Sequence, residues 1–305
     1  MKYWTERAEI SCNTLLGWAR LKANKYHTWR KRYGKANNHN GKIPRDWWLE
    51  EWEKQAILDY HEKHSLEGYR RMTFMMLDDD VVAVSPSSTY RVLKAAGRLD
   101  RKNISPSKKG TGFVQPKKIH QEWHTDITYL NLGGTFYFMI SVLDGFSRYI
   151  VHWEIRETMK EFDIEVVIAK AIEKHPGVKP RIISDNGPQF IAKDFKEFIR
   201  VYGLTHVRTS PYYPQSNGKL ERWHGSLKQE CIRPSCPATI EEAEKRVTHY
   251  VHHYNTVRLH SAIGYVTPAD CLAGLSKVIG DERDRKLEEA RQRRQAKRSN
   301  EKQVA

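Results

Sequence analysis

The hydrophobic periodicity of the chain changes near residue 120, and this change constrains the fold more than any other feature. Before it, apolar residues recur at helical spacing; after it, short runs rich in β-branched and aromatic residues predict strands. Three strand-like runs come first (WHTDITYL, TFYFMISVLDGF, RYIVHWEIR), followed by helix, strand, helix, strand, helix, helix. This order predicts an α/β fold of mixed α+β type, with a mixed five-stranded sheet flanked by helices over residues 120–275.

Residues 1–97 read as helices only, and we expect this region to bind DNA. Ser85 is a favourable N-cap, Pro86 suits the first helical position, and Gly97 can end the helix SSTYRVLKAAG. With the preceding helix GYRRMTFMML, this pattern predicts a helix-turn-helix over about residues 66–97. A plain helical bundle explains the same pattern.

Two further helical patterns precede that unit. Asp46 can cap a helix over WWLEEWEKQAILDYHEKH, and SCNTLLGWARLKANKYHTWRKRYG reads as a second helix-turn-helix. Six of the nine tryptophans fall before residue 53, and we expect most of them to anchor a core rather than to stack on bases.

The two remaining segments are polar and basic. Residues 98–119 have the Ser, Pro, Gly and Lys content of a linker that connects domains or tracks a DNA backbone. Residues 276–305 are charged and carry few large apolar side chains, so we expect a solvated helix or a disordered end rather than a DNA contact.

The charge balance indicates a polyanionic partner. The 52 Lys and Arg residues exceed the 37 acids, which gives a formal net charge of +15 and favours nucleic acid over a partnerless basic protein. No apolar run approaches ~20 residues, and the N-terminus lacks an apolar signal core, so we expect no membrane segment and a cytoplasmic location. The four cysteines form no zinc-ligand pattern with the histidines, and we expect reduced thiols.

Three carboxylates occupy positions from which they can converge. Asp126 lies inside a predicted strand, Asp185 ends the strand RIISD before an Asn-Gly turn, and Glu221 lies at the start of a helix. Each alone has an ordinary structural explanation. Three converging carboxylates repel one another unless a cation joins them, and their hard oxygens suit Mg²⁺ or Mn²⁺. Two such ions support in-line displacement at phosphorus.

The motifs around these acids resemble a known family. The segments are W-x-x-D-I-T at Trp123–Thr128, S-D-N-G-P-x-F at Ser184–Phe190, the loop and helix start at Ser210–Arg222, and Y-N-x-x-R-x-H-S-A-I-G-Y-x-T-P at Tyr254–Pro268. Together they resemble the DDE transposases of the retroviral-integrase-like superfamily, and most of all the OrfB-type transposases of bacterial insertion sequences. The upstream GYRR at residues 68–71 is similar to the helix-turn-helix of those proteins.

The resemblance implies an RNase H-like catalytic core in which Asp126, Asp185 and Glu221 bind two Mg²⁺ or Mn²⁺ ions. Lys228 lies two helical turns after Glu221, where the family often has a basic residue that contacts element-end DNA. We expect Arg258 and His260 either to position DNA or to stabilise the fold. The full set of expected DNA-binding residues is Lys228, His224, Asn217, Arg222, Arg70, Arg71, Ser88, Arg91 and Lys94.

The expected function is therefore that of a DNA transposase. It would bind terminal repeats of double-stranded DNA, hydrolyse a phosphodiester to free a 3′-OH, and transfer that strand to target DNA. The resemblance implies a homo-oligomer on the bacterial nucleoid and, because no heptad repeat is visible, a possible small helix-turn-helix partner protein. The alternatives are an RNase H-like nuclease without strand transfer and a transposase-derived repressor.

Overall fold

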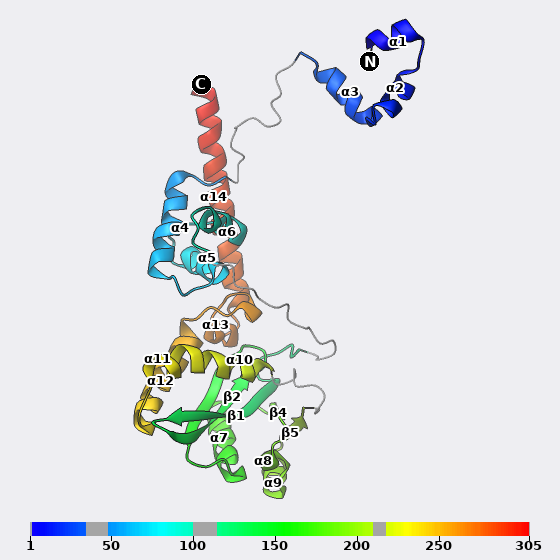
Figure 1. Cartoon of the computed structure of the whole chain (residues 1–305). Helices are drawn as coiled ribbons and strands as arrows, with labels where there is room; N and C mark the ends of the chain where they lie inside the picture. The colour runs from blue at the N-terminus through cyan, green and yellow to red at the C-terminus, as the bar shows by residue number, and fades with distance from the viewer. Residues whose placement is uncertain (1, 35–47, 100–114, 210–217, 305) are drawn as a thin grey trace. The chain divides into compact units, whose positions relative to one another are not determined.

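The structure is a computed structural model that describes residues 2–34, 48–99, 115–209 and 218–304 (Figure 1). The chain divides into two units, residues 1–48 and 49–305. The described part of the first unit contains helices α1 (Lys2–Ala8), α2 (Cys12–Trp18) and α3 (Ala23–Arg32). Leu16 is its only described residue with a buried hydrophobic side chain.

The N-terminal tryptophans do not anchor a core, so that prediction is wrong. Trp4, Trp18 and Trp29 are each more than half exposed, and Trp48 and Trp52 are exposed as well. The physical reason is that helices of 7 to 10 residues, with one buried apolar side chain among them, provide no interior for an indole ring.

Three helices at the start of the second unit form a domain around one apolar cluster. They are α4 (Glu51–Lys63), α5 (Tyr69–Asp78) and α6 (Pro86–Ala95). Ser85 caps α6 and Pro86 takes its first position, as predicted. Asp46 lies outside the described residues, and α4 begins with a capping box between Glu50 and Glu53. The shared cluster consists of Ile57, Tyr60, Met72, Met76, Val82, Val84 and Leu93.

The following domain is built on a mixed five-stranded sheet, which confirms the predicted fold class. Its strands are β1 (Glu122–Leu132), β2 (Thr135–Asp144), β3 (Ile150–Arg156), β4 (Arg181–Ser184) and β5 (Thr205–Arg208), in the order β3-β2-β1-β4-β5. The first three strands pair antiparallel, and β4 pairs parallel with both β1 and β5. This mixed order is the RNase H-like topology.

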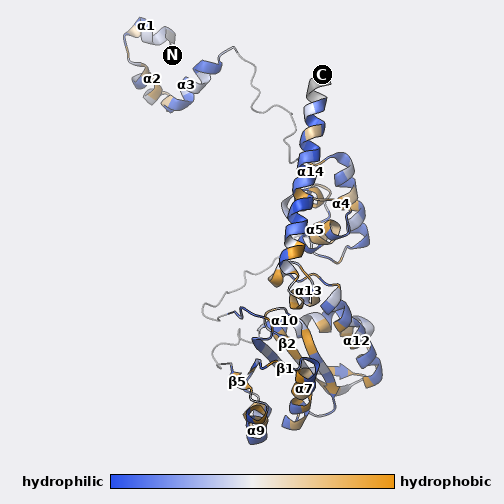
Figure 2. Ribbon diagram, turned by 180° about the vertical axis from the view of Figure 1, so that it is seen from behind, coloured by the Kyte–Doolittle hydropathy of each residue, from blue (hydrophilic) through white to orange (hydrophobic). Residues whose placement is uncertain are grey.

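Helices cover both faces of the sheet, as Figures 1 and 2 show. One apolar layer joins the sheet to α7 (Glu161–Lys174), α8 (Pro188–Ile191) and α9 (Lys193–Val201). The opposite layer joins it to α10 (Gly218–Leu227), the π-helical segment η3 (Lys228–Ile232) and α12 (Ile240–Thr256). The short elements α11 (Arg233–Ser235), η4 (Ser261–Ile263) and α13 (Pro268–Leu272) complete the described part of this domain.

The charged C-terminal segment differs from the expected solvated tail. Ser276–Val304 form one long helix, α14, which is hydrophilic along most of its length (Figure 2). Arg283, Ala290 and Arg294 are nevertheless buried, because the two arginines pair with acids on α4 and α5. None of the described helices combines the length and apolar character that a membrane crossing requires.

Candidate active site on the sheet and helix α10

Asp126 lies within β1, and Asp185 directly follows β4, the parallel strand beside it. The ladder between β1 and β4 ends with His124 opposite Ile183, and each aspartate lies two residues beyond that pair. Because side chains alternate along a strand, the two carboxylates belong to the same face of the sheet. Leu130, an even number of residues from Asp126, packs in the apolar layer beneath α10, so this is the face that α10 covers.

Helix α10 carries the third acid across this face. Glu221 lies in the first turn and is exposed, whereas His224, one turn later, is buried beside Asp126. The His224 Nδ1 atom lies 3.7 Å from Asp126 Oδ2, and its Nε2 atom lies 3.4 Å from the Ser141 hydroxyl. Trp223 Nε1 donates to the same hydroxyl at 3.4 Å. Since Ser141 pairs directly with Asp126 across β1 and β2, this contact sets the helix against the acidic position.

The backbone orients both aspartates. Asp126 Oδ1 accepts a hydrogen bond from the N–H of Ile127 at 2.9 Å, and Asp185 Oδ1 accepts one from the N–H of Gly187 at 2.9 Å. Asn186 turns the chain away by donating to the Thr209 carbonyl at 2.6 Å. Each carboxylate is thereby held in place through its Oδ1 oxygen.

The electrostatics of the site favour a bound cation. Burial, followed by the charge of Asp185 and a smaller contribution from Glu221, raises the pKa of Asp126 from 3.8 to about 7. Burial and the nearby Lys228 lower the pKa of His224 to about 3, so the imidazole is neutral at pH 7 and cannot offset the carboxylates. Lys228 itself interacts with Asp126, although burial lowers its pKa.

The donor set suits Mg²⁺ or Mn²⁺ better than a softer metal. It consists of carboxylate oxygens on neighbouring elements, and only 18% of the Asp126 side chain is exposed. No group of three or more His, Cys, Asp and Glu residues within the described ranges is already gathered closely enough to hold a metal ion. The three acids are therefore neighbours that a cation would draw together rather than a preformed cage.

The predicted DNA-binding residues divide by exposure. Arg91 and Lys94 are exposed on α6, and Ser88 is half-buried with its hydroxyl 3.1 Å from that of Ser85. Arg70 and Arg222 are exposed as well. These residues are accessible to DNA, and their contacts with it stay predictions.

Two other members of that set are placed less favourably. His224 is only 6% exposed and lies beside Asp126, which argues against a direct DNA contact. Arg71 is half-buried and paired with Glu67, which lies just before its helix. Asn217 lies outside the described residues.

Two contacts near η3 were not predicted from the sequence. Arg258 Nη2 donates to Glu230 Oε1 at 2.7 Å, and the Tyr250 hydroxyl donates to Glu230 Oε2 at 2.9 Å. His260 Nδ1 accepts from the Ala262 N–H at 3.2 Å. These contacts favour the interpretation that Arg258 and His260 stabilise the fold over the one in which they position DNA. Arg258 supports the π-helical segment that begins at Lys228, and such segments recur at functional sites.

Ser141 was also missed, although the sequence carries a signal for it. It is the one polar residue in the apolar run FMISVL, and a polar side chain buried in a strand interior usually has a specific partner. Its partners, Trp223 and His224, come from more than 80 residues later in the chain.

Comparison with known proteins finds family models that match this domain. Residues 116–214 and residues 202–268 match two family models, each described as an integrase core domain. The combined span, residues 116–268, covers half of the chain and includes all three acids. The domain that carries the three acids is therefore similar to integrase core domains over residues 116–268.

Its relatives include proteins of bacterial insertion elements. A 48.2 kDa protein of insertion element IS2A from Escherichia coli is 27% identical over 231 residues, which are 71% of this chain and 54% of that protein. The transposase InsD of insertion element IS2D from Escherichia coli strain K12 is 27% identical over 219 residues, 67% of this chain and 73% of that protein. The match thus spans about half the length of the first relative.

Solved structures of viral integrase proteins match this chain at low similarity. A chain of the simian T-cell lymphotropic virus intasome, in complex with PP2A regulatory subunit B56 gamma, is 18% identical with a TM-score of 0.45 and covers 71% of this chain and 74% of that one. The catalytic core domain of BIV integrase is 24% identical with a TM-score of 0.41 and covers 52% of this chain and 97% of that one.

Proposed function

We propose that this chain is a DNA transposase that acts on the ends of an insertion element. It binds the terminal repeats, hydrolyses a phosphodiester to free a 3′-OH, and transfers that strand to target DNA. The observation that carries the proposal is the proximity of the three acids: Asp126 in β1 has its pKa raised by burial, by Asp185, directly after the neighbouring strand β4, and by Glu221 in the first turn of α10. The matches to integrase core domain models and the likeness to an insertion-element transposase support it.

The three acids would hold the divalent ions, and no side chain would bond covalently to DNA. Two bound Mg²⁺ or Mn²⁺ ions supply the charge that activates the attacking oxygen and stabilises the leaving one. Asp126 and Asp185 hold their positions through the backbone N–H groups of Ile127 and Gly187. Glu221 adds a third carboxylate from the first turn of α10, close enough to contribute, after burial and Asp185, to the raised pKa of Asp126.

The two steps balance without a protein nucleophile. In the first, a water oxygen bonds to phosphorus and gives up a proton, while the element's 3′-oxygen leaves and takes up a proton to become the 3′-OH. In the second, the 3′-OH oxygen bonds to a phosphorus of the target strand, whose own 3′-oxygen leaves. The number of phosphodiester bonds is unchanged in the second step, so no energy source is needed.

The basic surface and the helix-turn-helix supply the DNA contacts. Arg91 and Lys94 lie on the exposed side of α6, opposite the buried Thr89 and Leu93. Side chains on such a helix read base edges in the major groove, while other cations bind phosphates and make affinity fall with salt. Two ends must be joined, so the protein acts as a homo-oligomer on DNA in the bacterial cytoplasm.

A strand-transfer assay with pre-cleaved element ends separates this function from its two rivals. A transposase joins the ends to target DNA, a nuclease of the same fold only cuts, and a repressor only binds. Asp185→Asn is expected to lower joining more than about 100-fold while DNA binding is retained, because a metal ligand contributes more than the residues that support it. Asp194→Asn, an exposed acid in the first turn of α9, is the matched control. Full joining by Asp185→Asn would refute the assigned role.

A further inference from the structure

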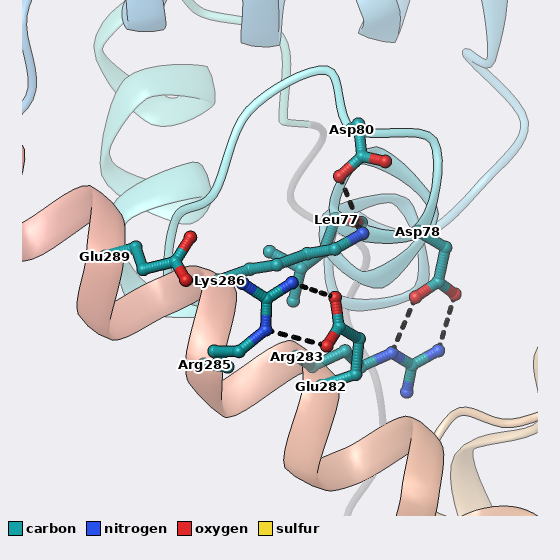
Figure 3. Close-up of polar contacts among 8 residues, drawn as sticks. All are labelled: Leu77, Asp78, Asp80, Glu282, Arg283, Arg285, Lys286 and Glu289. Atoms are coloured by element: carbon teal, nitrogen blue, oxygen red, sulfur yellow. Dashed lines mark hydrogen bonds and ion pairs between the residues drawn. The ribbon is translucent and has the colours of Figure 1, made fainter.

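Helix α14 makes a specific contact with the C-terminal end of α5. Arg283 on α14 is only 5% exposed. Its Nε donates to Asp78 Oδ1 at 2.7 Å and its Nη2 donates to Asp78 Oδ2 at 2.6 Å, as Figure 3 shows. This is a two-point contact between a planar guanidinium and a carboxylate, which fixes orientation as well as distance.

The same guanidinium also contacts the integrase core. Arg283 Nη2 donates to the Tyr265 carbonyl at 2.9 Å, and Nη1 donates to the Gly264 carbonyl at 3.4 Å. One buried side chain therefore joins three segments: α14, the end of α5 in the helix-turn-helix, 205 positions earlier in the sequence, and the loop after η4 in the core, 18 to 19 positions earlier.

The core loop that accepts these hydrogen bonds has an unusual backbone conformation. Gly264 has φ = 80° and Tyr265 has φ = 59°, a left-handed conformation that bulky residues rarely adopt. Such a conformation persists only where its surroundings hold it. Here the Tyr265 ring stacks on Phe74 of α5 with ring centroids 4.7 Å apart, and the Arg283 guanidinium lies 4.9 Å from the centroid of the Phe74 ring.

Lys286 of α14 also binds the end of α5, whereas its neighbour Arg285 does not. Lys286 Nζ lies 2.6 Å from Asp80 Oδ1 and donates to the Leu77 carbonyl at 2.9 Å, at the end of α5 where carbonyls lack helical partners. Arg285 instead pairs within α14, with Glu282 and Glu289 (Figure 3). Arg285 is thus an internal control of the same residue type.

The covalent connection alone does not fix the helix-turn-helix relative to the core. Residues 96–121 separate the end of α6 from the start of β1. A segment of that length has a reach of up to about 90 Å when extended. Any fixed relation between the two domains must therefore come from non-covalent contacts such as those of Arg283.

We propose that Arg283 is a positioning residue that couples the helix-turn-helix to the integrase core, so that a fixed distance along DNA separates the sequence read by α6 from the phosphodiester that is cut. This inference rests on the proposed function and adds what determines the place of the cut. Neither the acids nor the fold of the core sets that distance, because they act on any phosphodiester brought to them.

The direct test maps the cut on end-labelled element DNA with the full chain and Mg²⁺. Wild type and Arg285→Ala are expected to cut mainly at one phosphodiester. Arg283→Ala is expected to bind the same DNA with little loss and to cut at several neighbouring positions. Arg283→Lys is expected to lie between them, since an ammonium replaces the two-point contact with a single one. A single unshifted cut by Arg283→Ala, at the wild-type rate, overturns the proposal.

Hydrogen exchange on the same variants tests the coupling independently of catalysis. In Arg283→Ala, amides of residues 75–80 and 264–266 are expected to exchange faster, whereas those of β1 and β2 keep their wild-type protection. Arg285→Ala is expected to change neither. If Arg283→Ala does not fold, Asp78→Asn, which keeps the shape and weakens the pair, takes its place. Unchanged exchange in both segments refutes the coupling, whereas loss of cutting by the wild type refutes only the proposed function.

Discussion

The integrase core and the joint made by α14 are held together by different forces. In the core, apolar layers cover both faces of the sheet, and Trp123, Trp223 and Phe195 are almost fully buried. At the joint, α14 binds α4 and α5 through paired charges, among them Arg283 with Asp78 and Arg294 with Glu53. Burial of apolar area is strong and non-directional, whereas buried ion pairs are directional and sensitive to the loss of one partner. The apolar packing thus keeps the core rigid, whereas the ion pairs fix the orientation of α14 relative to α4 and α5.

The largest effect on stability is expected from a cavity in the core. Phe195→Ala removes a fully buried ring that packs edge-to-face on Phe190, with centroids 5.6 Å apart. We expect a loss of about 3–5 kcal/mol in the free energy of unfolding. Urea unfolding measures it, and Phe198→Ala, which is only partly buried against the same cluster, is the control with a smaller loss. Equal losses for the two would contradict the packing described.

At the acidic site, a substitution is expected to increase the stability of the core. The Asp126 pKa is raised from 3.8 to about 7, so the unfolded chain releases its proton first and wild type loses stability as pH rises through that window. Above about pH 7 this loss is complete and amounts to at most about 4 kcal/mol. Asp126→Asn avoids it. In metal-free buffer the variant is therefore expected to be more stable than wild type at alkaline pH.

Two controls for this comparison vary the pH and the concentration of Mg²⁺. Near pH 4 the difference between Asp126→Asn and wild type is expected to shrink towards zero, because the carboxyl is protonated in the folded wild type. Added Mg²⁺ is expected to stabilise wild type and leave the variant almost unchanged. A variant that is less stable than wild type at every pH would show that Asp126 is stabilised by a partner instead.

A smaller effect on the free energy of unfolding is expected where α14 binds α4. Arg294→Leu leaves the carboxylate of Glu53 buried without its partner 2.6 Å away, at a cost of about 3 kcal/mol. Adding Glu53→Gln removes that charge and keeps the acceptor for the Glu50 N–H, so the double variant should recover most of the loss. A double-variant cycle by thermal unfolding tests this, and strict additivity would mean that the pair is not coupled.

The smallest expected effect on stability is at the start of helix α6. Ser85 caps α6 by accepting from the Ser88 N–H at 3.3 Å, and Ser85→Ala is expected to cost about 1 kcal/mol. Exchange of the first amides of α6 measures it. Ser87→Ala, exposed two residues later, is expected to have little effect, and an equal cost for both would argue against the cap.

The order of elements and the relation of the acids could be predicted because they depend on short-range patterns. The strand-like runs around Asp126 and before Asp185 have clear alternation or apolar content, and parallel pairing brings the two together. The cap at Ser85 is equally local. Such features are encoded within a few residues of where they act.

The features that could not be predicted depend on partners distant in sequence. His224 is buried because Ser141 and Asp126, from two strands, receive it. Residues 276–304 form a docked helix because Arg283 and Arg294 meet acids more than 200 positions earlier. A charged segment looks solvated in the sequence unless its counter-charges are known to be near.

The shared binding of divalent ions by Asp126, Asp185 and Glu221 is tested most directly by a crystal structure with Mn²⁺, using its anomalous scattering. We predict peaks between the two aspartates on the α10 face of the sheet, with the Glu221 carboxylate drawn towards them and the peaks lost in Asp185→Asn. Peaks bound by other residues, or none at these acids under conditions in which the protein joins DNA, would contradict the account.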